Sequence, residues 1–157
     1  MSFESFVDER GPRLLRAAWL LTADRQHAED LVQTALTKCF SRYDGEDARF
    51  EAYVRTTMHR TYISWWRRRS WHERPSEYLR EELGENSATE DRLDLARALR
   101  TLTREQRAAI TLRYFDDLTV PEVAKVLGMP LGTVKSHIHR GLAALRASGL
   151  IVEEAVA

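Results

Sequence analysis

The chain has 157 residues, of which 43% are apolar and 31% charged, and its 24 basic residues balance 24 acidic ones. This composition is typical of a globular protein, and the length allows one ordinary domain or two small ones. The sequence has no apolar run of 18 residues, and its acidic start is unlike a secretory signal. These features exclude a membrane-spanning helix, and we expect a cytoplasmic protein.

The first half of the chain shows apolar residues at helical spacing and no alternating strand pattern. The stripes predict helices over about 3–10, 14–21, 26–42 and 48–71. Gly11 and Pro12 are expected to separate the first two, because proline removes a backbone donor. Asp24 is a suitable N-cap for the third. The prediction is an all-α fold.

The second half of the chain carries clear helix boundaries. Leu93 to Leu102 marks one helix, and Thr103 with Gln106 forms a capping-box pattern that opens the next, which runs through Tyr114. A short loop over 116–118 follows. Thr119 and Glu122 repeat the capping pattern, and Gly128 is a suitable C-terminal cap. A last helix, ending near Arg146, completes a predicted helix-turn-helix.

Charge is distributed unevenly along the chain. Residues 1–72 have a net charge of +2, residues 73–94 of −5, and residues 95–157 of +3. The acidic middle, which contains Pro75 and Gly84, is typical of a solvated linker. We therefore predict domains over 1–72 and 93–150, an acidic linker over 73–92 and a tail over 151–157.

The last helix has two chemically different faces. At about 100° per residue, Val134, Ile138, Leu142 and Leu145 share an apolar face. The opposite face holds Lys135, Ser136, His139, Arg140 and Arg146. This face contains no acid, as a helix in the DNA major groove requires, although a solvated basic face is the simpler alternative. Gly141 lies inside this helix and weakens it by about 1 kcal/mol relative to Ala, which suggests close helix packing.

Aromatic and basic residues interleave near the end of the 48–71 helix. The segment contains Tyr62, Trp65, Trp66 and Trp71 together with Arg60, Arg67, Arg68 and Arg69. Arginine neutralises phosphate and aromatic rings stack on unpaired bases. Some of these rings are expected in the core instead. Trp65 and Trp66 diverge by about 100°, so we expect one to be buried and one to lie at the surface.

No residue pattern indicates catalysis, a metal or a cofactor. Cys39 is the only cysteine and continues an apolar stripe, so we expect a buried thiol and no Cys-based zinc site. His137 and His139 point about 200° apart on a helix and cannot chelate one ion. We find no nucleophile–base pair, paired carboxylates or phosphate loop. The chain is therefore not expected to be an enzyme.

Three segments together carry a family resemblance. They are AEDLVQTAL (28–36), SWWRRR (64–69) and the stretch from LTREQRAAI to GLAALR (102–146). In this order they resemble extracytoplasmic-function (ECF, group IV) RNA polymerase sigma factors, in particular the short actinobacterial SigE-like group. The likeness implies sigma region 2 at about 1–72 and region 4 at about 93–150, with no region 3.

The resemblance also implies partners and site residues. The partners are core RNA polymerase, through its β′ clamp and β flap, promoter DNA, and a candidate anti-sigma factor. Contacts with core polymerase would come from Glu29, Asp30, Gln33, Thr34 and Thr37. The −10 element would be bound and melted by Arg49, Phe50, Arg60, Tyr62, Trp65, Trp66, Arg67, Arg68 and Arg69. The −35 element would be read by Thr133, Lys135, Ser136, His139, Arg140 and Arg146.

Two other functions compete with this interpretation. Leu102 and Thr103, with the stretch 133–137, also resemble LuxR-type DNA-binding domains, which regulate transcription without being polymerase subunits. Such a regulator has no reason to carry the 28–36 and 64–69 segments. A helix-turn-helix that binds another protein is the third hypothesis, and the acid-free face of the last helix argues against it.

Overall fold

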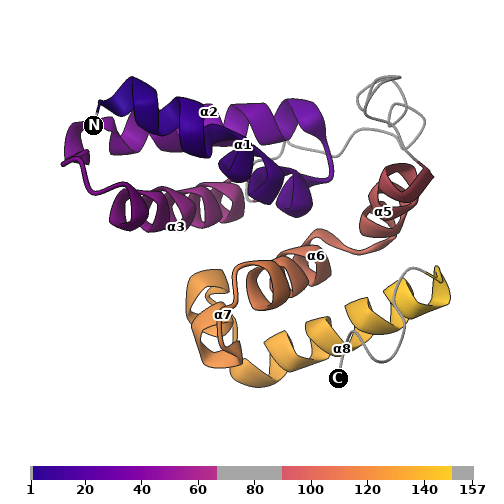
Figure 1. The fold of residues 1–157 in the computed structure, drawn as a ribbon. Helices are drawn as coiled ribbons and strands as arrows, with labels where there is room; N and C mark the ends of the chain where they lie inside the picture. Colours follow the sequence, from indigo (N-terminus) through magenta and orange to yellow (C-terminus); the bar gives the residue numbers. More distant parts are fainter. Residues whose placement is uncertain (1, 67–89, 150–157) are drawn as a thin grey trace. The chain divides into compact units, whose positions relative to one another are not determined.

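The computed structural model describes residues 2–66 and 90–149, with side chains from residue 94 in the second range. Every regular element in these ranges is a helix, which confirms the all-α prediction (Figure 1). The chain divides into two compact units, residues 1–72 and 73–157. None of the described helices is long and apolar enough to cross a membrane.

The first unit is a three-helix bundle. It consists of α1 (Phe3–Thr22), α2 (Arg25–Cys39), a 3₁₀ turn η1 (Phe40–Arg42) and α3 (Asp47–Trp66). Helix α2 packs against both α1 and α3 (Figure 1). Its predicted apolar stripe is buried and includes Leu31, Ala35 and Cys39. Asp24 caps α2 as expected, because its Oδ1 accepts a hydrogen bond from the backbone N–H of His27 at 3.0 Å.

The predicted break at Gly11-Pro12 is wrong, since α1 continues through both residues. Pro12 is exposed, and a proline inside a helix costs about 3 kcal/mol. Phe6, on one side of the proline, and Leu14 and Leu21, on the other, are buried on the same face of the helix. Each contributes about 1.5–3 kcal/mol by leaving water, so their combined burial outweighs the proline.

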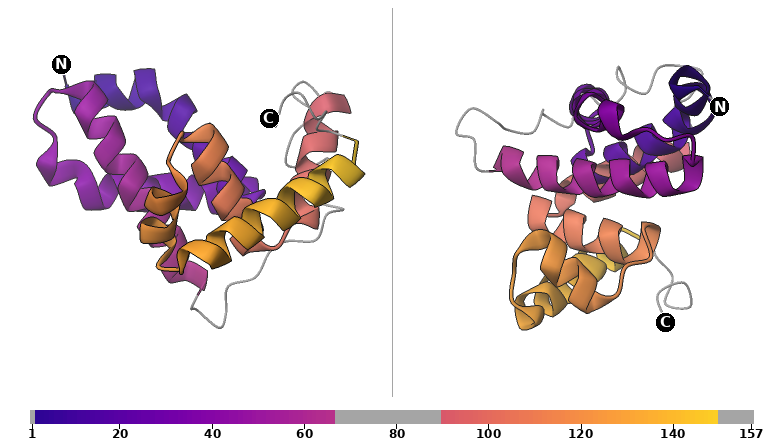
Figure 2. Two further views of the ribbon diagram at one scale, coloured as in Figure 1. Left: turned by 90° about the horizontal axis from the view of Figure 1, so that it is seen from below. Right: turned by 90° about the vertical axis from the view of Figure 1, so that its left-hand side faces the viewer.

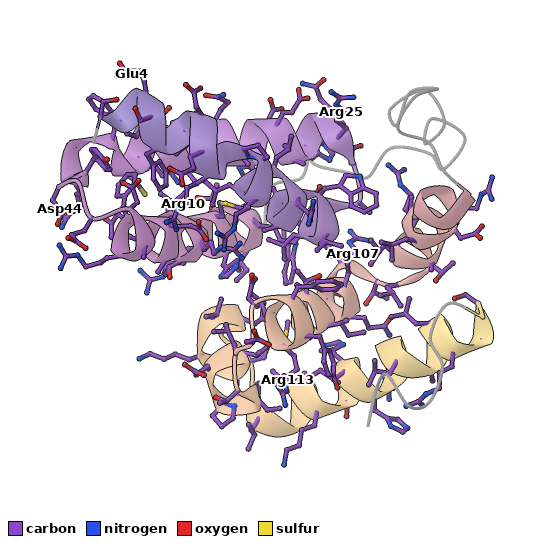
Figure 3. The ribbon with its side chains drawn as sticks, in the orientation of Figure 1. Glu4, Arg10, Arg25, Asp44, Arg107 and Arg113 are labelled. Atoms are coloured by element: carbon purple, nitrogen blue, oxygen red, sulfur yellow. The ribbon has the colours of Figure 1, made fainter. Side chains whose placement is uncertain are left out.

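A buried carboxylate ties α1 to α3. Glu51 is almost fully buried and accepts from Arg10 on α1 at 3.1 Å and from Arg55 on its own helix at 3.3 Å. Arg13, also on α1, lies 3.4 Å away. Figure 3 shows Arg10 reaching from α1 toward α3. Three cations thus surround one carboxylate, which stabilises its charge inside the bundle.

The second unit contains the predicted helix-turn-helix. Its elements are α5 (Glu90–Thr101), α6 (Arg104–Ile110), a π-helical turn η3 (Thr111–Phe115), α7 (Val120–Leu127) and α8 (Leu131–Ala147). Both capping boxes form as predicted, at Thr103 and at Thr119. Gly128 ends α7 with φ of 66°, in the left-handed region that glycine tolerates. A short turn then joins α7 to α8 (Figure 2).

The end of the predicted linker is helical. Helix α5 begins at Glu90 and so includes residues 90–92, the last three of the predicted linker. The rest of the linker, residues 73–89, lies outside the described residues. So do the predicted extension of α3 over 67–71 and the tail.

Two contacts position α8 and α5 against α6. A Cβ atom on Gly141 would overlap Cδ1 of Ile110, so glycine there allows the close packing of α8 on α6 without a shift of the Ile110 side chain. Arg107 of α6 is fully buried, and its Nη1 donates to the backbone oxygen of Leu99 at 3.1 Å (labelled in Figure 3). This hydrogen bond satisfies a carbonyl in the last turn of α5.

Candidate nucleic-acid and protein interfaces

Helix α2 presents a polar row on the face opposite its buried stripe. This α2 polar row consists of Glu29, Asp30, Gln33, Thr34 and Thr37. All are exposed except Thr34, which is half-buried. Glu29 forms an ion pair with Arg25 at 3.1 Å, one turn earlier. The row is held on a rigid helix, so it offers hydrogen-bonding groups at set spacings to a partner protein.

Helix α8 presents a second polar surface. This α8 basic face consists of Thr133, Lys135, Ser136, His139, Arg140 and Arg146, and all six are exposed. The apolar residues assigned to the opposite side, such as Val134 and Ile138, are buried. Helix α8 itself contains no acidic residue. Its cations are therefore available to phosphate and to base edges.

Three aromatic residues expected at the −10 element lie in the core instead. Phe50 is 3% exposed, Tyr62 is fully buried and Trp65 is 7% exposed. The Phe50 ring packs edge-on against Phe6 and Tyr43, with centroids 4.8 and 5.0 Å apart. These rings have no free face for a base, so that part of the prediction is corrected. The reason is the phase of α3, which turns all three toward the other helices.

The remaining residues expected at the −10 element fall into three groups. Of the adjacent pair, Trp65 is buried, as expected for one of the two, and Trp66 is half-buried rather than fully at the surface. Arg49 is exposed and pairs with Asp44 in the preceding loop. Arg60 is exposed. The residues Arg67, Arg68 and Arg69 lie outside the described part of the chain.

The loop before α3 is held by local polar contacts. The backbone N–H of Glu46 and the Arg49 side chain keep the pKa of Asp44 below its usual value. Partial burial and the hydrogen bond to Asp47 raise the pKa of Tyr43. The Tyr43 hydroxyl donates to Oδ1 of Asp47 at 2.9 Å. These contacts connect the loop to the start of α3.

Sequence reasoning missed Tyr53, which is 40% exposed. The guanidinium of Arg42 lies 5.8 Å from the centroid of its ring, within cation–π distance. The helical spacing of residues in α3 could have indicated that Tyr53 is exposed. Once Phe50, Val54 and Met58 set the buried face of α3, positions 53, 57, 60 and 64 form a separate stripe.

That stripe lines a hollow of about 300 Å³ between α2 and α3. The α2–α3 hollow is formed by Lys38, Tyr53, Thr57, Arg60, Thr61 and Ser64. Lys38 reaches in from α2, and its Nζ donates to Oγ1 of Thr61 at 3.1 Å. No carboxylate belongs to the lining. The hollow therefore combines two cations, three hydroxyls and one aromatic ring.

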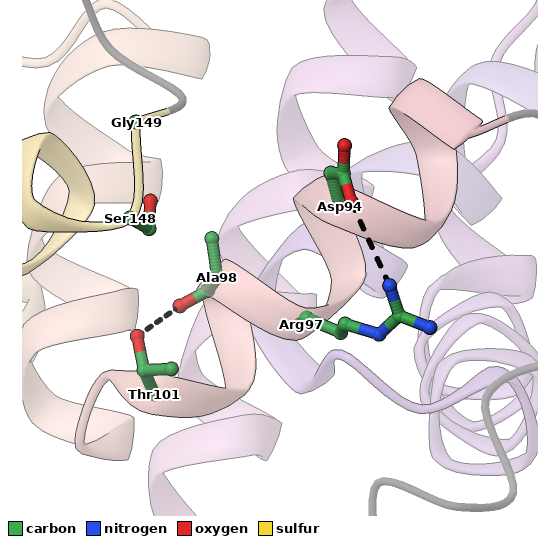
Figure 4. A pocket seen from close by; sticks show the side chains of 6 residues that line it. All are labelled: Asp94, Arg97, Ala98, Thr101, Ser148 and Gly149. Atoms are coloured by element: carbon green, nitrogen blue, oxygen red, sulfur yellow. Dashed lines mark hydrogen bonds and ion pairs between the residues drawn. The ribbon is translucent and has the colours of Figure 1, made fainter.

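A second hollow, in the other unit, has a different character (Figure 4). Its volume is about 270 Å³, and it lies between α5 and the end of α8. Its two charged groups, Asp94 and Arg97, pair with each other at 3.6 Å. Thr101 donates to the backbone oxygen of Ala98 at 2.6 Å. These polar groups of the second hollow thus interact with one another or with the backbone.

Comparison with known proteins identifies both units. Residues 6–72 match the family described as Sigma-70 region 2, and residues 92–145 match Sigma-70, region 4. The RNA polymerase sigma-E factor of Streptomyces avermitilis is 41% identical over 150 residues, covering 93% of this chain and 84% of the relative. The SigE ECF sigma factor of Mycolicibacterium smegmatis is 32% identical, covering 92% and 60%. The chain belongs to the ECF group of RNA polymerase sigma factors.

A solved structure supports the same fold. The sigma factor RpoE from Bartonella quintana, crystallised with the anti-sigma factor NepR, matches this sigma factor with a TM-score of 0.64. The match covers 93% of this chain and 95% of the other at 23% identity. The region 2 match over 6–72 disfavours the LuxR-type alternative, which accounts only for the C-terminal unit. The protein is thus a transcription initiation factor that acts with core RNA polymerase at promoter DNA.

Proposed function

We propose that this sigma factor uses its two units for different parts of promoter recognition. The α8 basic face reads the −35 element in the major groove, and α3 with its neighbouring loop contacts and opens the −10 element. The observation that carries this proposal is the exposed, acid-free face of α8 opposite a buried apolar stripe. A recognition helix needs both sides, one to bind DNA and one to hold the helix in its domain.

The α2 polar row is the proposed contact with the β′ clamp of core polymerase, and the second unit is proposed to bind the β flap. The α2 row lies on a helix that packs on both neighbours, so its side chains keep their relative positions. Rigid presentation lowers the entropy lost on binding. We further propose that the protein acts in the cytoplasm and that an anti-sigma factor is an additional partner. The RpoE–NepR pair gives a precedent for that partner.

Catalysis is assigned to the polymerase rather than to this chain. The role proposed for this protein is to position the polymerase and to separate the DNA strands.

Run-off transcription on fragmented genomic DNA tests the overall proposal. Discrete start sites are expected only when core polymerase and this protein are both present. If the chain binds DNA but produces no new starts, it acts as a regulator outside the polymerase, and the proposal fails.

The polymerase contact has its own test, with Asp30→Ala combined with Gln33→Ala. We expect weaker binding to core polymerase and unchanged binding of the protein to −35 DNA. The matched control is Asp8→Ala, which removes an exposed acid from α1. Equal affinity of the double variant and the control for core polymerase would refute the assignment.

A further inference from the structure

The α2–α3 hollow is lined by hydrogen-bonding groups and by no acid. Lys38 and Arg60 line it together with the hydroxyls of Thr57, Thr61 and Ser64, of which the Thr57 hydroxyl already donates to the backbone oxygen of Tyr53 at 3.1 Å. A ligand that fits this lining presents acceptors. Because the lining comes from two helices packed on each other, the donors are held on a rigid frame.

The cations of the hollow differ from most arginines of the same unit. Arg10, Arg13 and Arg55 surround Glu51, Arg25 pairs with Glu29, and Arg49 pairs with Asp44. Within the described residues, Arg60 has no such partner. Lys38 donates to a neutral hydroxyl, so its positive charge is not neutralised. Both charges therefore remain available to an incoming group.

The hollow also offers an aromatic surface. Tyr53 lines it and is 40% exposed, and Arg42 lies over its ring at 5.8 Å. The volume of about 300 Å³ is at the small end for ligand sites, which span about 300–1,000 Å³. This size suits a single base better than a longer segment. An aromatic ring has no use in binding phosphate alone, whereas it stabilises a nucleobase by stacking.

The chemistry of Arg60 selects among the bases. A guanidinium presents paired donors in a planar fork, and guanine places two acceptors, O6 and N7, side by side. Adenine places a donor, N6, beside its N7 acceptor. One of the two guanidinium donors would therefore face another donor. Guanine keeps O6 and N7 accessible in the major groove, so the same contact is possible before and after the strands separate.

We propose that the α2–α3 hollow binds one guanine of the promoter, with Arg60 as the residue that determines base specificity. The inference rests on the proposed function, in which α3 contacts the −10 element. Arg60 reads O6 and N7, Lys38 supplies the second positive charge, and Tyr53 borders the base. Lys38 is positioned by Thr61, and neither it nor Tyr53 was predicted from the sequence.

The test is transcription by the holoenzyme from a promoter library randomised across the −10 element. With the wild-type protein, guanine should be favoured at one position by roughly 5- to 150-fold over other bases. Arg60→Ala should remove this preference. Arg60→Asn should change it to adenine at the same position, because an amide side chain pairs with N6 and N7 of adenine.

The matched control is Arg16→Asn. Arg16 is an exposed arginine on α1 that does not line the hollow. This variant should keep the wild-type base preference. Arg60 is itself exposed, so its substitution leaves the core of the unit intact, and helical content measured by circular dichroism should be unchanged.

Two results would overturn the inference while leaving the proposed function in place. One is an Arg60→Asn holoenzyme that loses activity equally on all promoters, which would mean that Arg60 contacts only phosphate. The other is an unchanged preference, or a wild-type preference for a base other than guanine at the position that Arg60 controls. Failure of the proposed function is distinct, because the wild-type holoenzyme would then start at no promoter in the library.

Discussion

The arginines around Glu51 in the first unit and the arginines of α8 in the second unit are used in opposite ways. In the first unit, Arg10, Arg13 and Arg55 surround the buried Glu51 and join α1 to α3. In α8, Arg140 and Arg146 are exposed, and no ion pair connects them to a carboxylate among the described residues. An arginine that pairs with a nearby carboxylate helps to hold the helices together. An arginine without such a carboxylate can bind a partner molecule. The position of the acids therefore separates the arginines that join α1 to α3 from the α8 arginines that we propose to bind DNA.

In the second unit Arg107 is fully buried, and its substitution should have the largest effect on stability. Arg107→Ala removes a fully buried side chain and its hydrogen bond to the carbonyl of Leu99. We expect a loss of about 3–5 kcal/mol in the free energy of unfolding of the second unit. The volume-preserving Arg107→Met should lose less, about 1–3 kcal/mol.

Tryptophan fluorescence can distinguish the unfolding of the first unit from that of the second. All four, Trp19, Trp65, Trp66 and Trp71, lie within residues 1–72. In urea unfolding, Arg107→Ala should shift part of the circular dichroism transition and leave the tryptophan fluorescence transition in place. A matching shift in fluorescence would show that the two units unfold together.

Exposed cations of α8 should affect binding rather than stability. Lys135→Ala and Arg140→Ala are each expected to cost about 1–3 kcal/mol in affinity for the −35 element if they contact bases, with loss confined to particular positions. Binding to a panel of −35 variants measures this. Arg97→Ala, which removes a half-exposed cation of α5 paired with Asp94, is the control. Equal weakening on every sequence would instead assign these residues to phosphate.

The Glu51 network should show the cohesive role of arginine. Glu51→Gln leaves three arginines without their carboxylate, but their guanidinium groups retain partial access to water. We therefore expect a moderate loss of about 1–2 kcal/mol in the stability of the first unit, read by tryptophan fluorescence. Glu29→Gln, which breaks the exposed pair with Arg25, should cost less than about 0.5 kcal/mol. Similar losses in the two variants would contradict a special role for the buried carboxylate.

A smaller effect than that of Glu51→Gln is expected at Gly141. Alanine there gains about 1 kcal/mol of helix propensity, but its Cβ would overlap Cδ1 of Ile110 and cost about 1–3 kcal/mol. The net expectation for Gly141→Ala is a destabilisation of about 1 kcal/mol in the circular dichroism transition. Combining it with Ile110→Val removes the overlapping methyl group and should recover part of the loss. No recovery would place the strain elsewhere.

Much of the fold was predictable because its signals are local. The capping boxes at Thr103 and Thr119, the N-cap at Asp24 and the C-terminal Gly128 depend on residues within one turn of each other. The buried stripe of α2 and the two faces of α8 follow from helical period alone. Each of these features was predicted and is confirmed.

The failures came where distant contacts outweighed local preference. Pro12 predicts a break, yet the burial of Phe6 and Leu14 on one face keeps α1 continuous. Tyr62 and Trp65 look like base-stacking residues in a basic segment, but the packing of α3 places them in the core. Composition cannot distinguish a core ring from a surface ring when both stand beside arginines.

The sequence by itself determined the helical class, the helix caps, the two faces of α8 and the family. These depend on spacing and on side chains close in the chain. Only the tertiary structure decided which aromatic rings are buried, which arginines are neutralised by Glu51, and that Lys38 meets Arg60 in one hollow. Such groupings arise when helices pack and bring residues that are distant in sequence within a few ångströms, where burial and charge take effect.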